Sequence, residues 1–273
     1  MEGAVKGVND DMRLIVVETD NGRRRISTAL LLAAGTGSRL WPLTDDAPKC
    51  LTEVSGTTIL ERLVHSLRSR GFKRLVVVVG YLDHCIRKSL HTSIGGLTIE
   101  FIHSPRFRTT NNIYSLGLAR NAIQDPFVLF ESDLIFDTAL LDEMLEPDRI
   151  AVSRVLPWMN GTTVSVDPWR KVTRFYVGSQ PSPDQLTHKT VNMYSFSQAS
   201  WRGIASRLDR YVSAGRVDEY YESVFAELVA EDSLLFQAAF FDNECWYEID
   251  TLEDLREAKR RFPSHRRRSI SHV

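Results

Sequence analysis

Residues 31–51 read LLAAGTGSRLWPLTDDAPKCL, and this stretch decides the fold. An apolar run from Ala29 to Ala34 ends in Gly35-Thr36-Gly37, and Arg39 and Lys49 follow. A buried strand that runs into such a loop lets backbone amides approach a phosphate chain closely, because glycine has no side chain in the way. The two cationic side chains are available to neutralise that chain. The stretch therefore predicts a strand, a phosphate-binding loop and a nucleotide site.

The same loop disfavours two common nucleotide-binding motifs. A dinucleotide-binding fingerprint needs a third glycine where the next helix begins, and this chain has Leu40 there. A Walker loop needs Gly-Lys-Ser or Gly-Lys-Thr, which does not occur. Hydride transfer and Walker-type ATP hydrolysis are therefore disfavoured. Because a glycine pair can also mark an ordinary tight turn, the assignment depends on other segments.

The flanking segments alternate between strand and helix patterns. Strands are predicted at 29–34, 75–79, 98–103 and 127–130, and helices at 57–70, 81–90 and 112–122. Short strand-like pieces follow at 150–155, 162–166, 172–175 and 190–196, then a helix at 219–229, a strand at 235–240 and a helix at 252–261. The order predicts an α/β fold with a Rossmann-like, doubly wound sheet that binds its ligands at the carboxyl ends of the strands.

The chain of 273 residues predicts one main domain with an extension at each end. Residues 1–25 form the N-terminal extension, with an edge strand expected at Leu14–Val17. Residues 26–262 form the domain, divided into a nucleotide-binding half (26–150) and a smaller, β-rich half that covers the substrate (151–262). Residues 263–273 form a basic tail.

Composition narrows the class of protein. A formal net charge of −1 supplies no attraction to polyanions, which argues against a nucleic-acid partner. No apolar run approaches the roughly 20 residues that cross a membrane, so we expect no membrane partner. The three cysteines, Cys50, Cys85 and Cys245, are widely spaced and indicate neither a disulfide framework nor a zinc site. This usage fits a cytoplasmic protein.

Residues 31–51 resemble the signature of the sugar-nucleotidyltransferase superfamily. The matching positions are Gly35, Gly37, Arg39, Pro42-Leu43-Thr44 and Pro48-Lys49. The resemblance implies that Ala34, Gly35, Gly37 and Arg39 hold the nucleotide, and that Lys49 supports the phosphate at which substitution occurs. Residues 50–53, CLTE, replace the proline-containing continuation of the hexose-1-phosphate enzymes, which disfavours a sugar substrate.

Six later segments narrow the resemblance to the phosphocholine and phosphonoalkyl cytidylyltransferases. They are TNNIYSLGLA (110–119), LFESDLIF (129–136), NGTTV (160–164), HKTVNMYSFS (188–197), DEYYE (218–222) and WYEIDTLEDL (246–255). The resemblance implies the mixed sheet of the nucleotidyltransferase (GT-A-like) type. It also implies transfer of CMP from CTP to a small phosphonate or phosphate acceptor, as in phosphonate and antibiotic biosynthesis. A homodimer, or association with a phosphonate-pathway enzyme, is compatible with it.

Carboxylates far apart in the sequence are candidates for a magnesium site. Asp133 follows a predicted strand, and Glu248 and Asp250 lie among aromatic residues; oxygen ligands of this kind suit Mg²⁺, and the family places its metal there. Each acidic triplet taken alone is more often a solvated turn. The phosphonate nucleophile is largely ionised at neutral pH, since its second pKa is about 6, and needs no general base. Arg39, Lys49 and Lys189 would neutralise charge, although Lys189 alone could be a surface lysine.

The resemblance offers Tyr81, Asn112 and Ser115 as groups that recognise the cytosine base. Two of these side chains have ordinary alternatives. Asn112 could cap its helix, because asparagine is favoured there, and Tyr81 could pack over the sheet.

The acceptor is predicted to contact Glu131, Asn160, Tyr194 and Trp246. Relatives with amino-bearing acceptors tend to carry Asp before Gly-Thr, whereas this chain has Asn160, so 2-hydroxyethylphosphonate stands beside 2-aminoethylphosphonate. Glu131, Asp218 or Glu219 could still receive an ammonium group. The aromatic residues form either a cage or part of the core: Trp158, Tyr194, Tyr220, Tyr221 and Trp246.

Three alternatives to a phosphonate cytidylyltransferase remain open. Two are enzymes, acting on phosphocholine or on an inositol or sugar 1-phosphate. The third is a regulatory module that binds nucleotide without catalysis.

Overall fold

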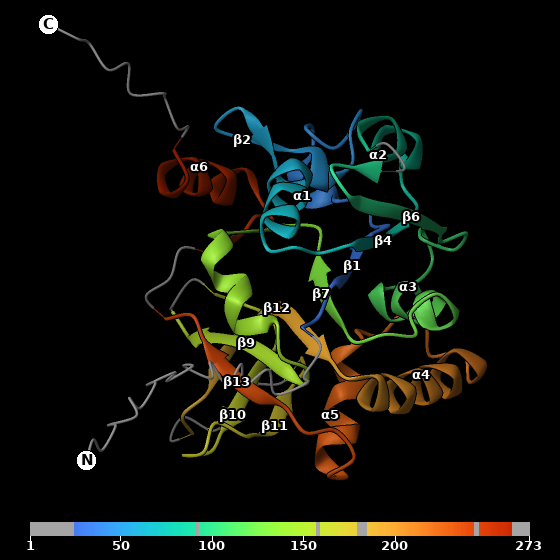
Figure 1. Cartoon of the computed structure of the whole chain (residues 1–273), viewed down its shortest axis with the longest axis vertical. Coiled ribbons are helices and arrows are strands. Elements are labelled where there is room, and N and C mark those ends of the chain that lie inside the picture. Colours follow the sequence, from blue (N-terminus) through green and yellow to red (C-terminus); the bar gives the residue numbers. More distant parts are fainter. Residues whose placement is uncertain (1–24, 91–92, 157–158, 179–184, 243–245, 264–273) are drawn as a thin grey trace, which may run out of the picture.

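The chain folds around one wide mixed sheet (Figure 1). This computed structural model describes residues 25–90, 93–156, 159–178, 185–242 and 246–263. Four parallel strands form the centre: β7 (Phe127–Glu131), β1 (Thr28–Ala33), β4 (Arg74–Val79) and β6 (Leu97–His103). The other strands are β5 (Ser93–Ile94), β9 (Arg149–Arg154), β10 (Thr163–Val166), β11 (Val172–Tyr176), β12 (His188–Phe196) and β13 (Gln237–Phe240).

The strand order is β11-β10-β12-β7-β1-β4-β6-β5, with β9 paired to both β12 and β13. Strands β1, β4 and β7 are nearly continuous apolar runs because both of their faces are covered, whereas β6 alternates buried and exposed residues over its first half. In β1, Leu31 lies opposite Val77 of β4 and Phe130 of β7. Strand β12 of the second predicted half pairs, antiparallel, with β7 of the first, so one sheet passes through both halves. The predicted boundary at residue 150 falls inside β9.

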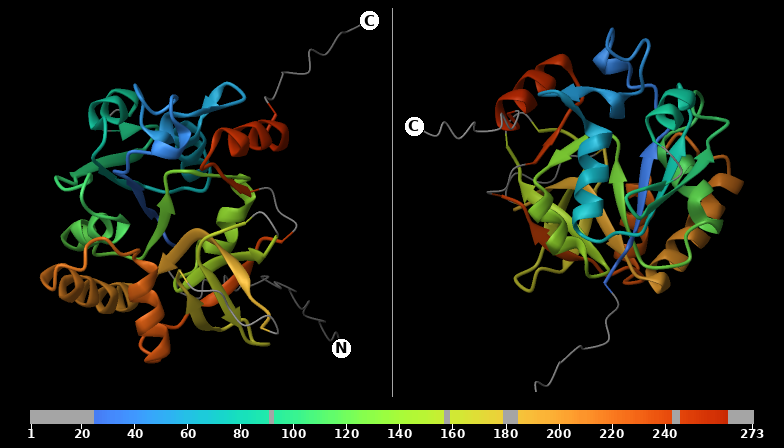
Figure 2. Two further views of the ribbon diagram at one scale, coloured as in Figure 1. Left: turned by 180° about the vertical axis from the view of Figure 1, so that it is seen from behind. Right: turned by 45° about the horizontal axis from the view of Figure 1, so that its top comes forward.

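Helices cover both faces of the sheet (Figure 2). Helices α1 (Ile59–Ser69) and α2 (Asp83–Ser89) pack on one face, and α3 (Asn112–Leu118), α4 (Gln198–Ser213) and α5 (Glu222–Ala230) on the other. Alternate residues of β1 supply the two cores, so that Leu31 faces α1 while Leu30 and Leu32 face α3. The expected α/β fold with a mixed sheet is confirmed.

A small antiparallel pair lies beside the main sheet. Strand β8 (Leu134–Phe136) pairs with β14 (Trp246–Glu248), and the hairpin of β2 (Glu53–Val54) and β3 (Thr57–Thr58) lies near α6 (Leu252–Arg261). A third apolar cluster that includes Leu40, Ile249 and Leu255 holds these pieces together. The β8–β14 pairing brings residues 246–248 back to the carboxyl end of β7.

Most predicted elements are present, but one long helix was missed. Helix α4 has 16 residues, begins after the Ser197 cap and buries Trp201, Ile204, Leu208 and Tyr211. The idea that Asn112 caps its helix is wrong, because Asn111 is the cap and its side chain accepts a hydrogen bond from the Asn112 amide. The expected edge strand at residues 14–17 lies outside the described residues. No helix in the described ranges is long and apolar enough to cross a membrane.

The chain order of the strands locates the site. From β1 the chain goes to β4 and β6 on one side, and then returns to place β7 on the other side of β1. Ligands of open α/β sheets bind at such a reversal, outside the carboxyl ends of the strands. Here the crevice lies between the loop after Ala33 and the residues that follow Glu131.

Candidate active site

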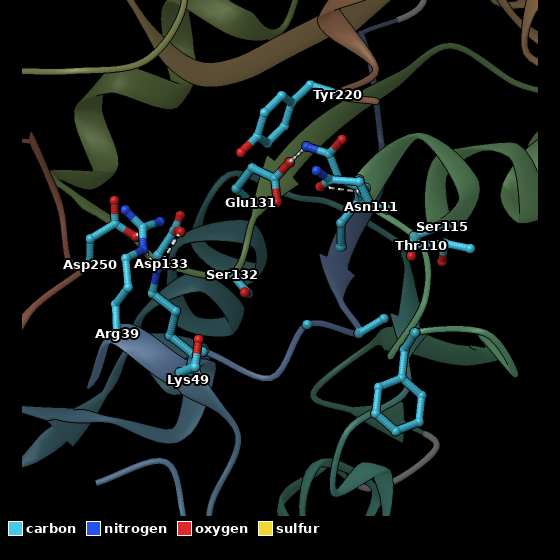
Figure 3. Close-up of a pocket in the computed structure, with 17 residues that line it drawn as sticks. Arg39, Lys49, Thr110, Asn111, Ser115, Glu131, Ser132, Asp133, Tyr220 and Asp250 are labelled. Carbon is cyan, nitrogen blue, oxygen red and sulfur yellow. Dashed lines mark hydrogen bonds and ion pairs between the residues drawn. The ribbon is translucent and has the colours of Figure 1, made fainter. Parts of the chain in front are cut away.

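A cavity opens between the carboxyl ends of β1 and β7 (Figure 3). Ten of the predicted site residues line it: Ala34, Gly35, Gly37, Arg39, Lys49, Asn112, Ser115, Glu131, Asp133 and Asp250. Figure 3 shows Arg39, Lys49, Asp133 and Asp250 gathered at one end, with Thr110 and Ser115 at the other. The cavity therefore has a charged end and a polar, uncharged end.

Lys49 joins the carboxylates at the charged end. Its Nζ donates to Asp133 Oδ2 at 2.7 Å and to Asp250 Oδ1 at 2.6 Å, and Arg39 Nη2 donates to the same Asp250 oxygen at 2.7 Å. Burial lowers the pKa of Lys49, but the two adjacent carboxylates outweigh burial and leave that pKa above its usual value. Lys49 is thus a fixed positive charge beside the glycine loop.

Three carboxylates at this end fit a divalent cation. Oxygen atoms of Asp133, Glu248 and Asp250 lie within 4.8 Å of one another. The Oδ1 atom of Asp133 is buried and has no hydrogen-bond partner in the described part of the chain. Hard oxygen donors of this type suit Mg²⁺, which takes one or two carboxylates and leaves room for phosphate oxygens. The structure brings together the three residues predicted for the metal, and the identity of the ion as Mg²⁺ stays a prediction.

The β8–β14 pair explains how residues so far apart in sequence converge. Asp133 immediately precedes β8, Asp250 follows β14, and the Ile249 amide donates to the Asp133 carbonyl at 3.0 Å. A capping box between Thr251 and Asp254 then begins α6. The Asp254 carboxylate of this box also accepts a hydrogen bond from the Asp250 amide at 3.1 Å. The position of Asp250 is therefore fixed by the strand before it and by the helix cap after it.

The glycine loop needs a residue without a side chain at position 37. Gly37 has φ +63°, and a Cβ there would lie 3.1 Å from both Lys49 Cβ and Thr44 Cγ2. The Thr44 hydroxyl donates to the Gly37 carbonyl at 3.0 Å and holds the turn. A Cβ at Gly35 would meet no atom within 4 Å, so that side of the loop is open.

A second hollow adjoins the first through Arg39, Glu131 and Asp250. Lys189 lines it and is only 3% exposed, so the alternative of a surface lysine is wrong. The Lys189 Nζ donates to the Thr190 carbonyl at 2.7 Å and lies 3.3 Å from Glu248 Oε2. Lys189 thus forms an ion pair with Glu248, one of the three clustered carboxylates.

Two predicted acceptor residues lie near Lys189. The exposed Asn160 and the buried Trp246 both line a hollow with it. Tyr194 does not, because it is fully buried and packs against other core aromatics, with ring centroids 5.8 Å from Tyr221 and 5.3 Å from Phe225. The prediction that Tyr194 contacts the acceptor is therefore wrong, because this residue belongs to the hydrophobic core.

Of the three residues predicted to recognise the base, two line the first cavity and one does not. Ser115 is buried and lines the uncharged end of the first cavity. The Asn112 amide donates to Glu131 Oε1 at 3.2 Å and accepts from the Tyr221 backbone at 3.0 Å, so it orders the cavity wall. Tyr81 lies outside the cavity lining, and its hydroxyl donates to the Thr44 and Asp45 carbonyls. The structure therefore gives Tyr81 the role of holding the loop.

Sequence reasoning missed several residues that line the two hollows. They are Ser38, Phe107, Thr110, Asn111 and Ser132 in the first and Thr162, Asn192 and Glu222 in the second. All but Ser38 and Phe107 lie inside the six quoted family segments, and that was the signal that could have found them. Asn192 has φ +59°, which no pattern in the sequence indicates.

Three carboxyl groups of the site have a raised pKa, and burial is the main cause for each: Glu131, Glu222 and Glu248. Burial raises the pKa of Glu222 to about 7, although its own backbone amide and Lys189 oppose the shift. Burial, Asp133 and Glu222 together raise the pKa of Glu131 well above its usual value. These carboxyl groups are buried close to one another, so each makes ionisation of a neighbouring one less favourable.

A model of the MobA-like NTP transferase domain matches residues 29–267, so the chain belongs to this family of nucleotidyltransferases. Among its relatives is the CMP-5'-(3-aminopropyl)phosphonate synthase of Streptomyces rubellomurinus, 31% identical over 245 residues. That match covers 86% of this chain and 38% of the relative, so the chain spans well under half of that protein's length.

Two further relatives are matched over most of their own length. The choline-phosphate cytidylyltransferase of Haemophilus influenzae is 31% identical, with 83% of this chain and 93% of the relative covered. The 2-aminoethylphosphonate cytidylyltransferase of Lancefieldella rimae is 25% identical, with 75% and 81% covered. The predicted membership of the nucleotidyltransferases, near the phosphonoalkyl and phosphocholine enzymes, is confirmed.

Solved structures confirm the fold. The CTP:phosphocholine cytidylyltransferase of Streptococcus pneumoniae superposes with a TM-score of 0.73 at 21% identity, covering 87% of this chain and 99% of that one. The inositol-1-phosphate CTP transferase of T. maritima gives a TM-score of 0.68 at 20% identity, covering 86% and 96%.

Proposed function

We propose that the enzyme transfers a cytidylyl group from CTP to a phosphonate or phosphate oxygen of a small acceptor and releases pyrophosphate. The observation that carries the proposal is the position of Lys49, which joins Asp133 and Asp250 next to the glycine loop. The names of the Streptomyces, Haemophilus and Lancefieldella relatives support CTP as the nucleotide. Acceptors such as 2-hydroxyethylphosphonate or 2-aminoethylphosphonate fit the scheme.

The glycine loop and its cations would bind the triphosphate. Gly35 and Gly37 leave the backbone open to a phosphate chain, and Arg39, more than half exposed at the rim and ion-paired with Asp250, would lie beside it. Mg²⁺, when bound by the three carboxylates, would supply further positive charge to the phosphate oxygens. Lys49 would then lie where charge develops on the α-phosphate.

The chemical step requires no general base on the protein. An ionised acceptor oxygen attacks the α-phosphorus, a new phosphorus–oxygen bond forms, and the bond to the β-phosphate breaks so that pyrophosphate leaves with the electron pair. No proton has to move. Lys189, facing Glu248 on the other side, would hold the acceptor's phosphonate close to the α-phosphorus.

The test is pyrophosphate release with Mg²⁺ and each of CTP, UTP, ATP and GTP. Each nucleotide is tried with 2-hydroxyethylphosphonate, 2-aminoethylphosphonate, phosphocholine, inositol 1-phosphate and glucose 1-phosphate. We expect release that depends on CTP together with a phosphonate or phosphocholine. Activity only with another nucleotide and glucose 1-phosphate would instead establish a sugar nucleotidyltransferase.

A further inference from the structure

Strand β12 carries a bulge beside the second hollow. Thr190 lies opposite Val152 of β9 and Tyr194 lies opposite Ile150, so β12 advances four positions while β9 advances two. The extra residues include Asn192, whose φ of +59° lies in the left-handed region. Asparagine adopts this conformation more readily than most residues, but it still costs energy that a regular strand does not. Strain of this kind is found at functional sites, where the aimed side chain has a task.

The bulge turns the Asn192 side chain away from the core. In a regular strand Asn192 would share a face with Tyr194 and Phe196, which are buried in the apolar core. Instead it lines the second hollow, where its Nδ2 donates to Glu248 Oε1 at 3.1 Å. The Thr190 hydroxyl donates to Asn192 Oδ1 at 3.2 Å, which leaves the amide nitrogen facing the carboxylate. The left-handed backbone therefore aims a donor at Glu248.

Both oxygen atoms of Glu248 are held by side chains of β12. Oε1 accepts from Asn192, and Oε2 lies 3.3 Å from Lys189 Nζ. Two donors on different oxygens fix the plane of a carboxylate, and each oxygen keeps a lone pair for a cation. Oxygen atoms of Glu248, Asp133 and Asp250 lie within 4.8 Å of one another. Glu248 is therefore oriented by the protein as one of the three carboxylates that fit a divalent cation.

Asn192 is uncharged, unlike the cations that hold the three carboxylates. A phosphate chain attracts Arg39, Lys49 and Lys189, so these side chains can be drawn from the carboxylates when nucleotide binds. The amide of Asn192 has no net charge to be attracted, and its hydrogen bond to Glu248 can persist with nucleotide and metal in the site. Donors that orient a metal ligand contribute about tenfold to a hundredfold in metal affinity.

We propose that Asn192 is a positioning residue for the metal: it holds Glu248 in the orientation that the divalent cation needs. The inference rests on the proposed function, because the cation at these carboxylates belongs to that reaction. It assigns Asn192 to metal binding and not to contact with the acceptor, although this residue lines the hollow that the acceptor would enter. It also explains why a strained asparagine occupies a position where glycine would be free of strain.

Two variants separate the amide of Asn192 from its backbone conformation. Asn192→Gly removes the amide and relieves the left-handed strain, whereas Asn192→Ala removes the amide and keeps the strain. Mn²⁺ binding is measured by electron paramagnetic resonance, with and without a non-hydrolysable CTP analogue, and stability by urea unfolding. We expect Mn²⁺ affinity to fall about tenfold to a hundredfold in both variants alike. Asn192→Ala should nevertheless unfold at a lower urea concentration than Asn192→Gly.

Kinetics and a control variant complete the test. In both Asn192 variants the Mg²⁺ concentration that gives half the maximal rate should rise, with the KM for the acceptor unchanged. High Mg²⁺ should restore most of kcat. Ser55→Gly is the matched control, because Ser55 has φ +56° in the β2–β3 turn and lines neither hollow. This change relieves the same kind of strain and should leave Mn²⁺ binding as in wild type.

The Mn²⁺ titrations also define what overturns the inference. Normal binding in Asn192→Gly with weak binding in Asn192→Ala would reduce the role of Asn192 to backbone support. Unchanged binding in both variants, or a higher KM for the acceptor without loss of Mn²⁺ affinity, would overturn the inference as well. In these cases the proposed function stands. Absence of turnover with every acceptor would contradict the proposed function, while the titrations would still decide the role of Asn192. Wild-type protein that binds no Mn²⁺, with or without the analogue, would contradict the metal site and this inference together.

Discussion

The two walls of the crevice are built in different ways. The glycine-loop wall comes from parallel strands and from residues close together in the sequence, and its cations Arg39 and Lys49 are already paired with Asp133 and Asp250. The opposite wall comes from antiparallel strands and from α5, and its residues come from scattered segments. There the Oε2 atom of Glu222 is buried and has no donor within the residues that the structure describes. The first wall is electrostatically complete before a ligand binds, and the second is not.

This difference separates two tasks. A wall whose charges are already fixed costs little reorganisation when a phosphate chain binds, which suits a reaction that depends on positioning and charge neutralisation. A wall with an uncompensated carboxylate binds a cationic ligand more tightly than a neutral one, which suits selection among acceptors. Variants on the two walls should therefore affect different kinetic parameters.

The largest effect is expected at the metal carboxylates. Asp133→Asn removes a charge that the cation needs and should lower kcat/KM by about a thousandfold or more, with the circular dichroism spectrum unchanged. Asp209→Asn, at an exposed ion pair with Arg120, is the matched control and should retain activity. Unchanged turnover in Asp133→Asn would rule out the metal site described here.

Lys49→Met should separate catalysis from metal binding. Loss of the cation should lower kcat/KM by about a hundredfold to a thousandfold. Without nucleotide, however, Lys49 competes with the metal for Asp133 and Asp250, so Mn²⁺ binding measured by electron paramagnetic resonance should become at least about tenfold tighter. Lys88→Met, on an exposed position of α2, should change neither quantity. Weaker Mn²⁺ binding in Lys49→Met would contradict the competition.

The uncompensated wall should show itself in the pH dependence of stability. The pKa of Glu222 is about 7 in the folded protein against 4.5 for an ordinary glutamate, so the folded state binds its proton more tightly. Stability from this group is present below about pH 4.5 and is lost as the pH rises through about 7, by up to about 3 kcal/mol. Urea unfolding at pH 5 and pH 8 should show a smaller decrease for Glu222→Gln than for wild type. The same decrease in both proteins would contradict the assignment.

A smaller effect is expected in the glycine loop. Gly37→Ala adds a Cβ that crowds Lys49 and Thr44, and it forces alanine into a left-handed conformation, so the KM for CTP should rise about tenfold. Gly56→Ala is the control, because Gly56 also has a positive φ but its Cβ would meet no atom within 4 Å. The left-handed backbone should cost each variant about 1–2 kcal/mol of unfolding free energy, and Gly37→Ala should lose more because its Cβ also crowds Lys49 and Thr44. An equal change of KM in both would show that strain alone is responsible.

Much of the glycine-loop wall could be predicted from the sequence because its chemistry is local. Gly35, Gly37, Arg39 and Lys49 fall within one short stretch, and the continuous apolar runs of β1 and β4 predict buried parallel strands. The meeting of Asp133 and Asp250 depends instead on the β8–β14 pair, and three-residue strands leave almost no periodic signal. Only the family resemblance predicted that meeting.

Other features depended on packing, which the sequence pattern does not resolve. Tyr194 was expected at the acceptor because aromatic residues serve equally in cages and cores, and its strand position turns it inward. Helix α4 was overlooked although Ser197 and the spacing of its apolar residues indicate it. Glu222 lies in an acidic, tyrosine-rich segment typical of an exposed helix start, and only the tertiary structure buries it.

The central claim is the joining of CMP to the acceptor's phosphonate, and ³¹P nuclear magnetic resonance of the reaction tests it most directly. With CTP, Mg²⁺ and 2-aminoethylphosphonate, we expect a phosphate signal and a phosphonate signal that are coupled to each other through one bridging oxygen, in equal amount to the pyrophosphate released. CTP hydrolysis without that coupled pair, or no reaction with any acceptor of the panel, would contradict the account.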